Sequence, residues 1–230
     1  MKRSTMRKAL FLLLVGVQPA MLAAQDARLG SRLDPATAAE VSALVASARA
    51  AGLPTEPLVD RALEGASKGA GPNRIVAAVR ALARDLTASR AALGAAAIES
   101  EVTAGAGALR AGADAGLLTR LRAARPPSAS VTVPLGVLAD LVGRGVPADT
   151  AARAVLALAQ GGATDQDFVA LRRNVERDIR AGAPPAIAAA LRSRGMPSTL
   201  PPSLAPASGA AVTAAPGAAD RATSRPAVKP

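Results

Sequence analysis

The sequence predicts an all-α protein of short helices, arranged as a solenoid-like helical-hairpin repeat or bundle and followed by a disordered C-terminal tail. The main observation is an internal repeat, because residues 44–86 and 137–179 align without a gap and keep their glycines and prolines. The matched pairs are Gly52 with Gly145, Pro54 with Pro147, Leu63 with Leu156, Gly69 with Gly162, Val76 with Val169, Arg80 with Arg173, Arg84 with Arg177 and Asp85 with Asp178. A second observation is the absence of Cys, which leaves helix packing rather than disulfides to stabilise the fold.

The N-terminal segment, residues 1–24, has the pattern of a secretory signal peptide. Four basic residues precede a short apolar run from Ala9 to Val17, and an Ala-rich stretch follows it. The run is shorter than the roughly 20 apolar residues that a spanning helix needs. We therefore expect cleavage after Ala24 and export to the periplasm or the medium, with an uncleaved anchor as the alternative. Cleavage would remove four positive charges from a chain of net charge +11 and leave +7.

Residues 25–196 are expected to form the helical domain, after a short leader that ends at Leu33. The Asp34-Pro35 pair predicts the start of the first helix, as an N-cap followed by Pro at the first helical position. Helices are expected over residues 35–51, 55–69, 72–86, about 117–121, 134–145, about 155–158, 164–179 and about 187–191. The Gly-interrupted region between Gly94 and Gly112 is also expected to be helical, and Gly105→Ala is expected to stabilise it. Residues 197–230 are rich in Pro, Ala, Ser and Thr without periodicity, which predicts disorder.

Five junctions share a pattern in which a basic residue is followed by Gly and then by a new helix start. They are RAAGLP, RAGADA, GRGVPA, RAGAPP and RSRGMP. This pattern is typical of helices that end on a glycine with a left-handed backbone. A phosphate-binding glycine loop would need a preceding strand, and the sequence offers none.

One segment resembles a known group of proteins. Residues 52–79, GLPTEPLVDRALEGASKGAGPNRIVAAV, are similar to a segment of uncharacterised exported bacterial helical proteins with the pattern G-[LI]-P-x-x-P-L-x-x-[KR]-x-x-E-G-x-x-K-G. The matching residues are Gly52, Pro54, Pro57, Leu58, Arg61, Glu64, Gly65, Lys68 and Gly69. The second repeat copy departs from this pattern, with Thr150, Ala157 and Gly161 at the positions of the second Pro, the Glu and the Lys. The resemblance implies export and a helical fold, and no chemistry.

Glu64 and Lys68 allow two interpretations. Their spacing of four residues is that of an exposed helical ion pair, while Lys68 as the lone lysine between the signal segment and Lys229 could act as a nucleophile or a phosphate contact. The ion pair is the preferred interpretation. Asp60 shares a face with Glu64, which could form a carboxylate pair or a cation site, but the nearby Arg61 favours simple charge balance.

The residue inventory excludes most catalytic classes. Without His or Cys there is no Ser-His-Asp or Cys-His arrangement and no usual zinc site. Asp165 and Asp167 resemble a metal pair but occupy the first turn of a helix, where acidic residues are favoured. Glu99 and Glu101 are two apart and are expected on different sides of a helix. A hydrolase that depends on a single carboxylate stays open as the enzymatic alternative, although the Tyr and Trp side chains that usually hold sugars are absent.

The basic surplus allows two interpretations: anionic partners, or a simply solvated Arg-rich surface, which is the preferred one. Arg172, Arg173, Arg177 and Arg180 are the candidate residues for binding an envelope polyanion, although Glu176 and Asp178 interrupt their stripe. Nucleic acid is not an expected partner, because recognition of single strands relies on aromatic stacking and Phe168 is the only aromatic residue after position 24.

These observations favour an exported, non-enzymatic helical protein of the cell envelope that binds or scaffolds an unidentified protein or envelope polymer. No catalytic, metal or cofactor residue is assigned, and no cofactor is expected. Contact with the membrane is expected only through the signal segment before cleavage.

Overall fold

The computed structural model describes residues 27–195, and this part of the chain is all-α. Residues 27–30 are helical and precede nine longer helices. These are α2 (Pro35–Ala50), α3 (Glu56–Ser67), α4 (Pro72–Leu93), α5 (Glu99–Arg110), α6 (Ala115–Ala124), α7 (Thr132–Gly143), α8 (Ala148–Gln160), α9 (Asp165–Arg180) and α10 (Pro185–Ser193). No residue of this range lies in a β-strand. The predicted signal peptide (1–24) and tail (197–230) lie outside the described residues.

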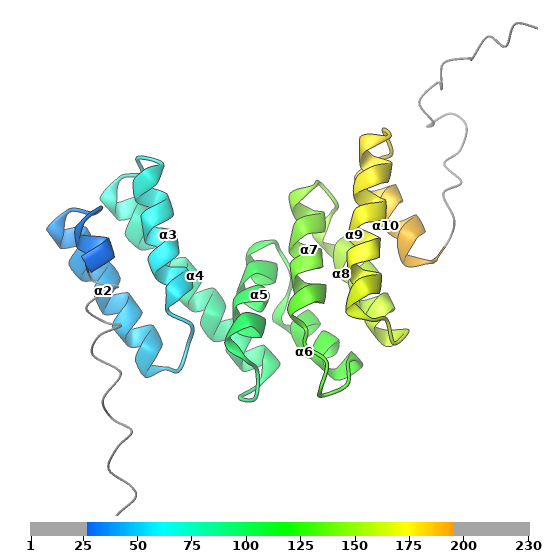
Figure 1. Ribbon diagram of the computed structural model, residues 1–230, viewed down its shortest axis with the longest axis horizontal. Helices are drawn as coiled ribbons and strands as arrows, with labels where there is room; N and C mark the ends of the chain where they lie inside the picture. The colour runs from blue at the N-terminus through cyan, green and yellow to red at the C-terminus, as the bar shows by residue number, and fades with distance from the viewer. Residues whose placement is uncertain (1–26, 196–230) are drawn as a thin grey trace, which may run out of the picture.

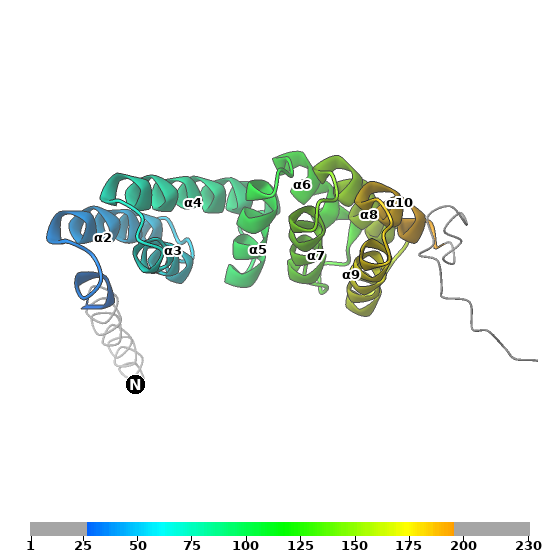
Figure 2. The same cartoon turned by 90° about the horizontal axis from the view of Figure 1, so that it is seen from above.

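The helices form an elongated stack of two rows (Figures 1 and 2). Seen from above, α4, α6, α8 and α10 follow one edge of the stack, while α3, α5, α7 and α9 follow the other (Figure 2). Neighbours within a row pack on each other, as α5, α7 and α9 do. Packing across the rows joins α3 to α4, α4 to α5, α7 to α8 and α9 to α10. At the N-terminal end the long helix α4 contacts α2, α3, α5 and α6, and so joins the first helices to the rest.

Glycines end most of the helices, as the sequence predicts. All five glycines of the junction pattern have positive φ, between 67° and 100°. They are Gly52, Gly112, Gly145, Gly182 and Gly195. The backbone closes as a Schellman motif, for example by the hydrogen bond from Leu53 N–H to the carbonyl oxygen of Ala48 at 2.9 Å. The capping interpretation of these glycines is therefore confirmed.

Helix starts also agree with their sequence signals. The carboxylate of Asp34 accepts a hydrogen bond from Thr37 N–H at 3.0 Å, and Pro35 is the first residue of α2. Helix α7 begins at Thr132, two residues earlier than Pro134, which occupies its first turn. Residues 27–30 are helical and the side chain of Leu29 is fully buried, so the leader belongs to the packed domain rather than merely preceding it.

The sequence repeat appears as equivalent helices. The first copy supplies the end of α2, all of α3 and most of α4, and the second copy supplies the end of α7, all of α8 and most of α9. The copies are five helices apart. Because consecutive helices alternate between the rows, an odd shift places equivalent helices in opposite rows: α3 shares a row with α9, and α4 with α8 (Figure 2).

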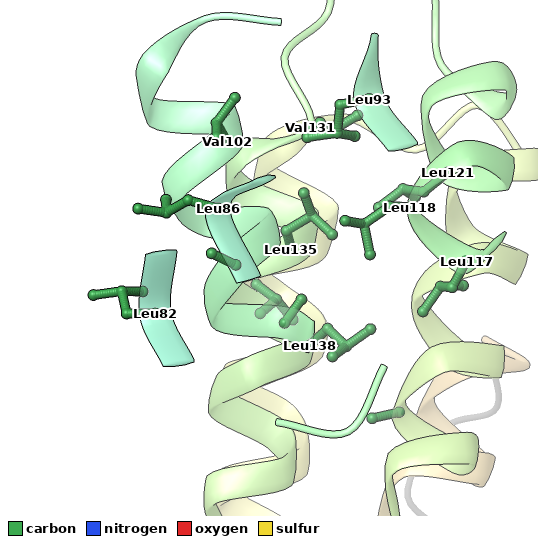
Figure 3. Close-up of a cluster of buried hydrophobic side chains, with 14 of the residues drawn as sticks. Leu82, Leu86, Leu93, Val102, Leu117, Leu118, Leu121, Val131, Leu135 and Leu138 are labelled. Atoms are coloured by element: carbon green, nitrogen blue, oxygen red, sulfur yellow. The ribbon is translucent and has the colours of Figure 1, made fainter. Parts of the chain in front are cut away.

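The apolar core runs through the described helices, and Figure 3 shows the part of it where α4, α5, α6 and α7 meet. Its labelled side chains are Leu82, Leu86, Leu93, Val102, Leu117, Leu118, Leu121, Val131, Leu135 and Leu138. All of them are buried, and burial of one Leu side chain contributes about 1.5–3 kcal/mol. Small residues allow the helices of this cluster to approach closely, as expected for an Ala-rich core.

One such approach corrects the expectation for Gly105. A Cβ atom there would lie 2.1 Å from the Ser89 hydroxyl oxygen and 3.0 Å from a methyl group of Leu118. Ser89 is itself fully buried on α4. The expected gain from Gly105→Ala is therefore wrong, because the steric overlap outweighs the gain in helix propensity.

Candidate functional site

The four arginines predicted to form a polyanion-binding stripe do not act alike in the structure. Arg172 donates a hydrogen bond to Asp140 on α7 at 2.9 Å, and Arg180 pairs with Glu176 one turn earlier on α9. These two charges are engaged within the fold. Arg173 and Arg177 remain exposed on the outer face of α9, and no ion pair joins either of them to an acidic residue of the described range.

Arg173 and Arg177 are one turn apart and line a shallow surface hollow of about 580 Å³. Asp165, Gln166 and Asn174 share its wall with Val169 and Ala170. The hollow has one carboxylate and two guanidinium groups, so its charge is positive but low. Of the four arginines in the predicted stripe, only Arg173 and Arg177 thus have no ion pair within the described residues.

Two carboxylates of the described residues are buried, and a hydrolase would need one in a pocket. Glu101 on α5 is 6% exposed. Its oxygens accept hydrogen bonds from Val131 N–H at 3.0 Å and Ile98 N–H at 3.2 Å, and Arg122 lies 3.3 Å away. Burial opposes the charged form, but these bonds and the Arg122 charge outweigh it and hold the pKa of Glu101 below its usual value. A carboxylate held in this way joins α5 to α7 and is a poor proton donor at neutral pH.

Asp178 is the second buried carboxylate. Arg192 on α10 donates to both of its oxygens, from Nε at 2.7 Å and from Nη2 at 2.8 Å. The two side chains are only 9% and 12% exposed. Such a bidentate pair gives both carboxylate oxygens a charged hydrogen-bond donor. Asp178 therefore fastens α10 onto α9.

The lone aromatic residue of the described range, Phe168, is also structural. It is fully buried at the start of α9, and the guanidinium carbon of Arg125 lies 5.3 Å from its ring centroid. Arg125 also donates to Asp165 at 2.6 Å and to the carbonyl oxygen of Ala163 at 3.3 Å. This set of contacts fastens the end of α6 to the α8–α9 turn, next to a hollow of about 710 Å³.

A charged hollow of about 310 Å³ lies between the end of α3 and the start of α4. Its lining residues are Arg61, Glu64, Gly65, Lys68, Gly69, Ala70, Arg74, Ile75 and Ala78. They include five of the residues that carry the sequence resemblance. Three cations surround a single carboxylate, so the hollow has a formal surplus of two positive charges.

Glu64 is the centre of this cluster. One carboxylate oxygen accepts from Lys68 at 2.5 Å and the other from Arg61 at 2.8 Å. Lys68 and Arg61 together lower the pKa of Glu64. The predicted pairing of Glu64 with Lys68 is therefore confirmed. Asp60 contributes to neither the hollow nor these pairs.

Two features of the hollow could not be read from local sequence. Gly65 forms part of the wall because a Cβ atom there would lie 2.9 Å from Cγ1 of Ile75, so the missing side chain lets α3 approach α4. Arg74 reaches the hollow from the first turn of α4 and is exposed. The signal that could have found Arg74 is its position two residues after Pro72, in the first turn of the helix, where an acidic residue is the usual choice.

The same position carries the opposite charge in the second repeat copy. Helix α4 has glycine as its N-cap and no acidic residue in its first turn. Helix α9 has Thr164 as its N-cap with two acidic residues in its first turn, and Asp167 accepts from the backbone N–H and the hydroxyl of Thr164 at 2.8 and 2.7 Å. Asp167 is the equivalent of Arg74 in the alignment. The predicted role of Asp167 at the start of α9 is thus confirmed.

Within the described residues, no group of three or more acidic side chains is placed to hold a metal ion. Over the same range, no helix combines the length and hydropathy required to cross a bilayer. Comparison of the chain with known protein families, curated proteins and solved structures finds no match.

Proposed function

We propose that the protein is an exported, non-enzymatic helical protein of the cell envelope that acts as a binding or scaffolding module. The observation that carries this proposal is the elongated two-row stack of helices (Figure 2). Stacked helical hairpins present a long continuous surface, which is the form of helical-repeat proteins that bind other macromolecules. The N-terminal pattern of residues 1–24 supports the exported location.

The state of the carboxylates supports binding over hydrolysis. Glu101 and Asp178 are both fastened between helices by arginines, and neither lines the hollows at the α3–α4 turn or on α9. Glu64 lies in a hollow, but two cations stabilise its charged form. A glycan-cleaving acid needs a raised pKa, which requires the opposite surroundings.

The test is a sedimentation assay with isolated envelope polymers. The mature protein is mixed with peptidoglycan sacculi or outer-membrane vesicles, and the pellet and the supernatant are analysed over time. We expect saturable co-sedimentation with no release of soluble fragments. Fragments whose release stops in Glu64→Gln or Glu101→Gln protein would establish the hydrolase instead. Absence of binding to every envelope fraction would contradict the proposal.

Binding of envelope polyanions is the second candidate, favoured by the free charges of Arg173 and Arg177 on α9. If these residues hold a polyanion, retention on heparin or lipopolysaccharide should fall steeply with salt, because such binding depends on counterion release. Arg173→Gln with Arg177→Gln should elute at lower salt than the parent. Elution of the parent no later than a neutral protein would exclude this candidate.

A further inference from the structure

We propose that the hollow between α3 and α4 is a binding site for a phosphate-type dianion, either inorganic phosphate or a phosphomonoester group. The site consists of Arg61, Lys68 and Arg74 around Glu64, with the uncapped start of α4 beside them. It gives the proposed binding function a chemical class of ligand, and in that respect rests on it.

Charge is the first support. Three cations and one carboxylate leave two positive charges unbalanced in a hollow of about 310 Å³. A phosphomonoester carries about −1.5 to −2 charges at neutral pH, so a single such group would balance the hollow. Arg74 forms no ion pair with the described residues, so its guanidinium is available to an incoming oxygen. Glu64, held between Arg61 and Lys68, already demonstrates that these two side chains converge on an oxyanion.

The start of α4 is the second support. A helix N-terminus carries a partial positive charge and unpaired N–H groups, and acidic side chains usually stabilise it. Here the N-cap is Gly71, which has no side chain, and the first turn contains Arg74 in place of an acid. A cation at this end of a 22-residue helix is unfavourable by itself. A bound anion would remove that penalty.

The second repeat copy is the third support. Its α8–α9 turn is equivalent to the α3–α4 turn but lacks the charged side chains of the hollow. In place of Arg61, Glu64, Gly65, Lys68 and Arg74 it has Ala154, Ala157, Leu158, Gly161 and Asp167. All four charged side chains of the hollow are lost or reversed there. Asp167 supplies the helix start of α9 with its own anion. The cationic cluster is therefore not a requirement of the helix–turn–helix geometry.

The test measures phosphate binding to the mature protein by isothermal titration calorimetry, together with thermal unfolding followed by circular dichroism at constant ionic strength. Inorganic phosphate should bind and raise the unfolding temperature above that in chloride. Arg74→Asp, which installs the residue of the second copy, should weaken phosphate binding by about tenfold or more. The same variant should unfold at a higher temperature than the parent when phosphate is absent, since its helix start is improved. That gain also verifies that the variant is folded.

Two further variants serve as comparisons, one expected to bind phosphate more tightly and one expected to bind it like the parent. Glu64→Gln removes the internal competitor and should tighten phosphate binding. Arg84→Asp makes the same charge change as Arg74→Asp at an exposed position of α4 that does not line the hollow, and it should bind phosphate within about twofold of the parent. Equal binding by Arg74→Asp and the parent would overturn the proposal, as would equal losses in Arg74→Asp and Arg84→Asp, or no phosphate effect beyond that of chloride.

Two additional arms identify the source of the group. A soluble sugar phosphate and vesicles containing phosphatidic acid are tested against the parent and Arg74→Asp. Binding of the sugar phosphate that the variant loses supports a soluble ligand, whereas vesicle binding that it loses supports a lipid headgroup. Vesicle binding that the variant keeps would contradict a role for this hollow at membranes. Co-sedimentation with envelope polymers in the absence of phosphate binding would overturn this site alone and leave the proposed function standing.

Discussion

The α3–α4 and α8–α9 turns have equivalent sequences, but the two turns are built for different surroundings. Both end their first helix on a glycine with positive φ, Gly69 at 67° and Gly162 at 76°. Both then start a new helix after the same number of residues. The helices nevertheless lie in opposite rows of the stack (Figure 2), so equivalent faces meet different neighbours. The repeated sequence therefore determines where the helices begin and end, whereas the row in which a helix lies determines which neighbouring helices its side chains contact.

The distance between the paired helices follows from one exchange of small for large residues. In the first copy Gly65 faces Ile75, and the absence of a side chain brings α3 onto α4. In the second copy Leu158 and Phe168 occupy the equivalent positions. These side chains are larger, and α8 makes little contact with α9, packing mainly on α6, α7 and α10. The cationic hollow forms only beside the glycine.

The largest expected difference between the copies is at Asp85 and Asp178. Asp178→Ala should lower the free energy of unfolding by about 3 kcal/mol, because the largely buried Arg192 guanidinium would lose its two hydrogen bonds to the Asp178 carboxylate. Asp85 approaches Arg110 only to 3.7 Å, in a pair that is partly exposed to solvent, so Asp85→Ala should cost less than about 0.5 kcal/mol. Urea unfolding of both variants measures this contrast. Equal losses of unfolding free energy in the two variants would contradict the predicted difference between the buried and the partly exposed ion pair.

The next largest effect is expected from giving Gly65 the residue of the second copy. Gly65→Leu should destabilise the protein by about 1–3 kcal/mol, since even its Cβ atom would lie 2.9 Å from Ile75. The matched control is Gly136→Leu on α7, where nothing lies within 4 Å of the added Cβ atom, and this variant should be neutral or stabilised. A fully stable Gly65→Leu protein would contradict the close packing of α3 on α4.

Glycine-to-alanine changes should separate caps from helix interiors. Gly52→Ala and Gly145→Ala are expected to lose about 1 kcal/mol each, because alanine disfavours positive φ. Gly107→Ala should gain up to about 1 kcal/mol, as its Cβ atom would meet open space within α5. Gly105→Ala, only two residues away, should lose stability against Ser89. Thermal unfolding of the four variants measures these differences. A stabilised Gly105→Ala protein would contradict the close contact between Gly105 on α5 and Ser89 on α4.

The smallest expected effect is the pH dependence that Asp167 confers. Hydrogen bonds from the Thr164 hydroxyl and backbone N–H lower the pKa of Asp167. A group whose pKa is lower in the folded state stabilises the protein above its unfolded pKa, and this contribution disappears as the pH falls through the folded value. The stability difference between the parent and Asp167→Asn should therefore be present at pH 7 and vanish well below about pH 4. A constant difference across this range would argue against the cap.

Sequence reasoning predicted the all-α fold, most helix boundaries and the capping glycines, because these depend on local signals such as the Asp34-Pro35 start. It was wrong about Gly105, since the neighbour that matters, Ser89, belongs to another helix. The sequence also did not predict that only part of the arginine stripe on α9 is unpaired. The reason is the same, because Arg172 is paired with Asp140 of another helix, α7. The pairing of Glu64 with Lys68 was predicted from their spacing. The hollow around it was not, because Arg74 joins it only when α3 and α4 fold together.

The most direct test of the central comparison is the change in backbone amide NMR shifts when inorganic phosphate is added to the mature protein at constant ionic strength. A site at the first turn predicts saturable shifts for residues 69–75 at the start of α4, with little change for residues 162–168 at the start of α9. Equal shifts at the two turns, shifts centred on Arg173 and Arg177, or no saturable shifts at all would contradict the claim that only the first copy carries an anion site.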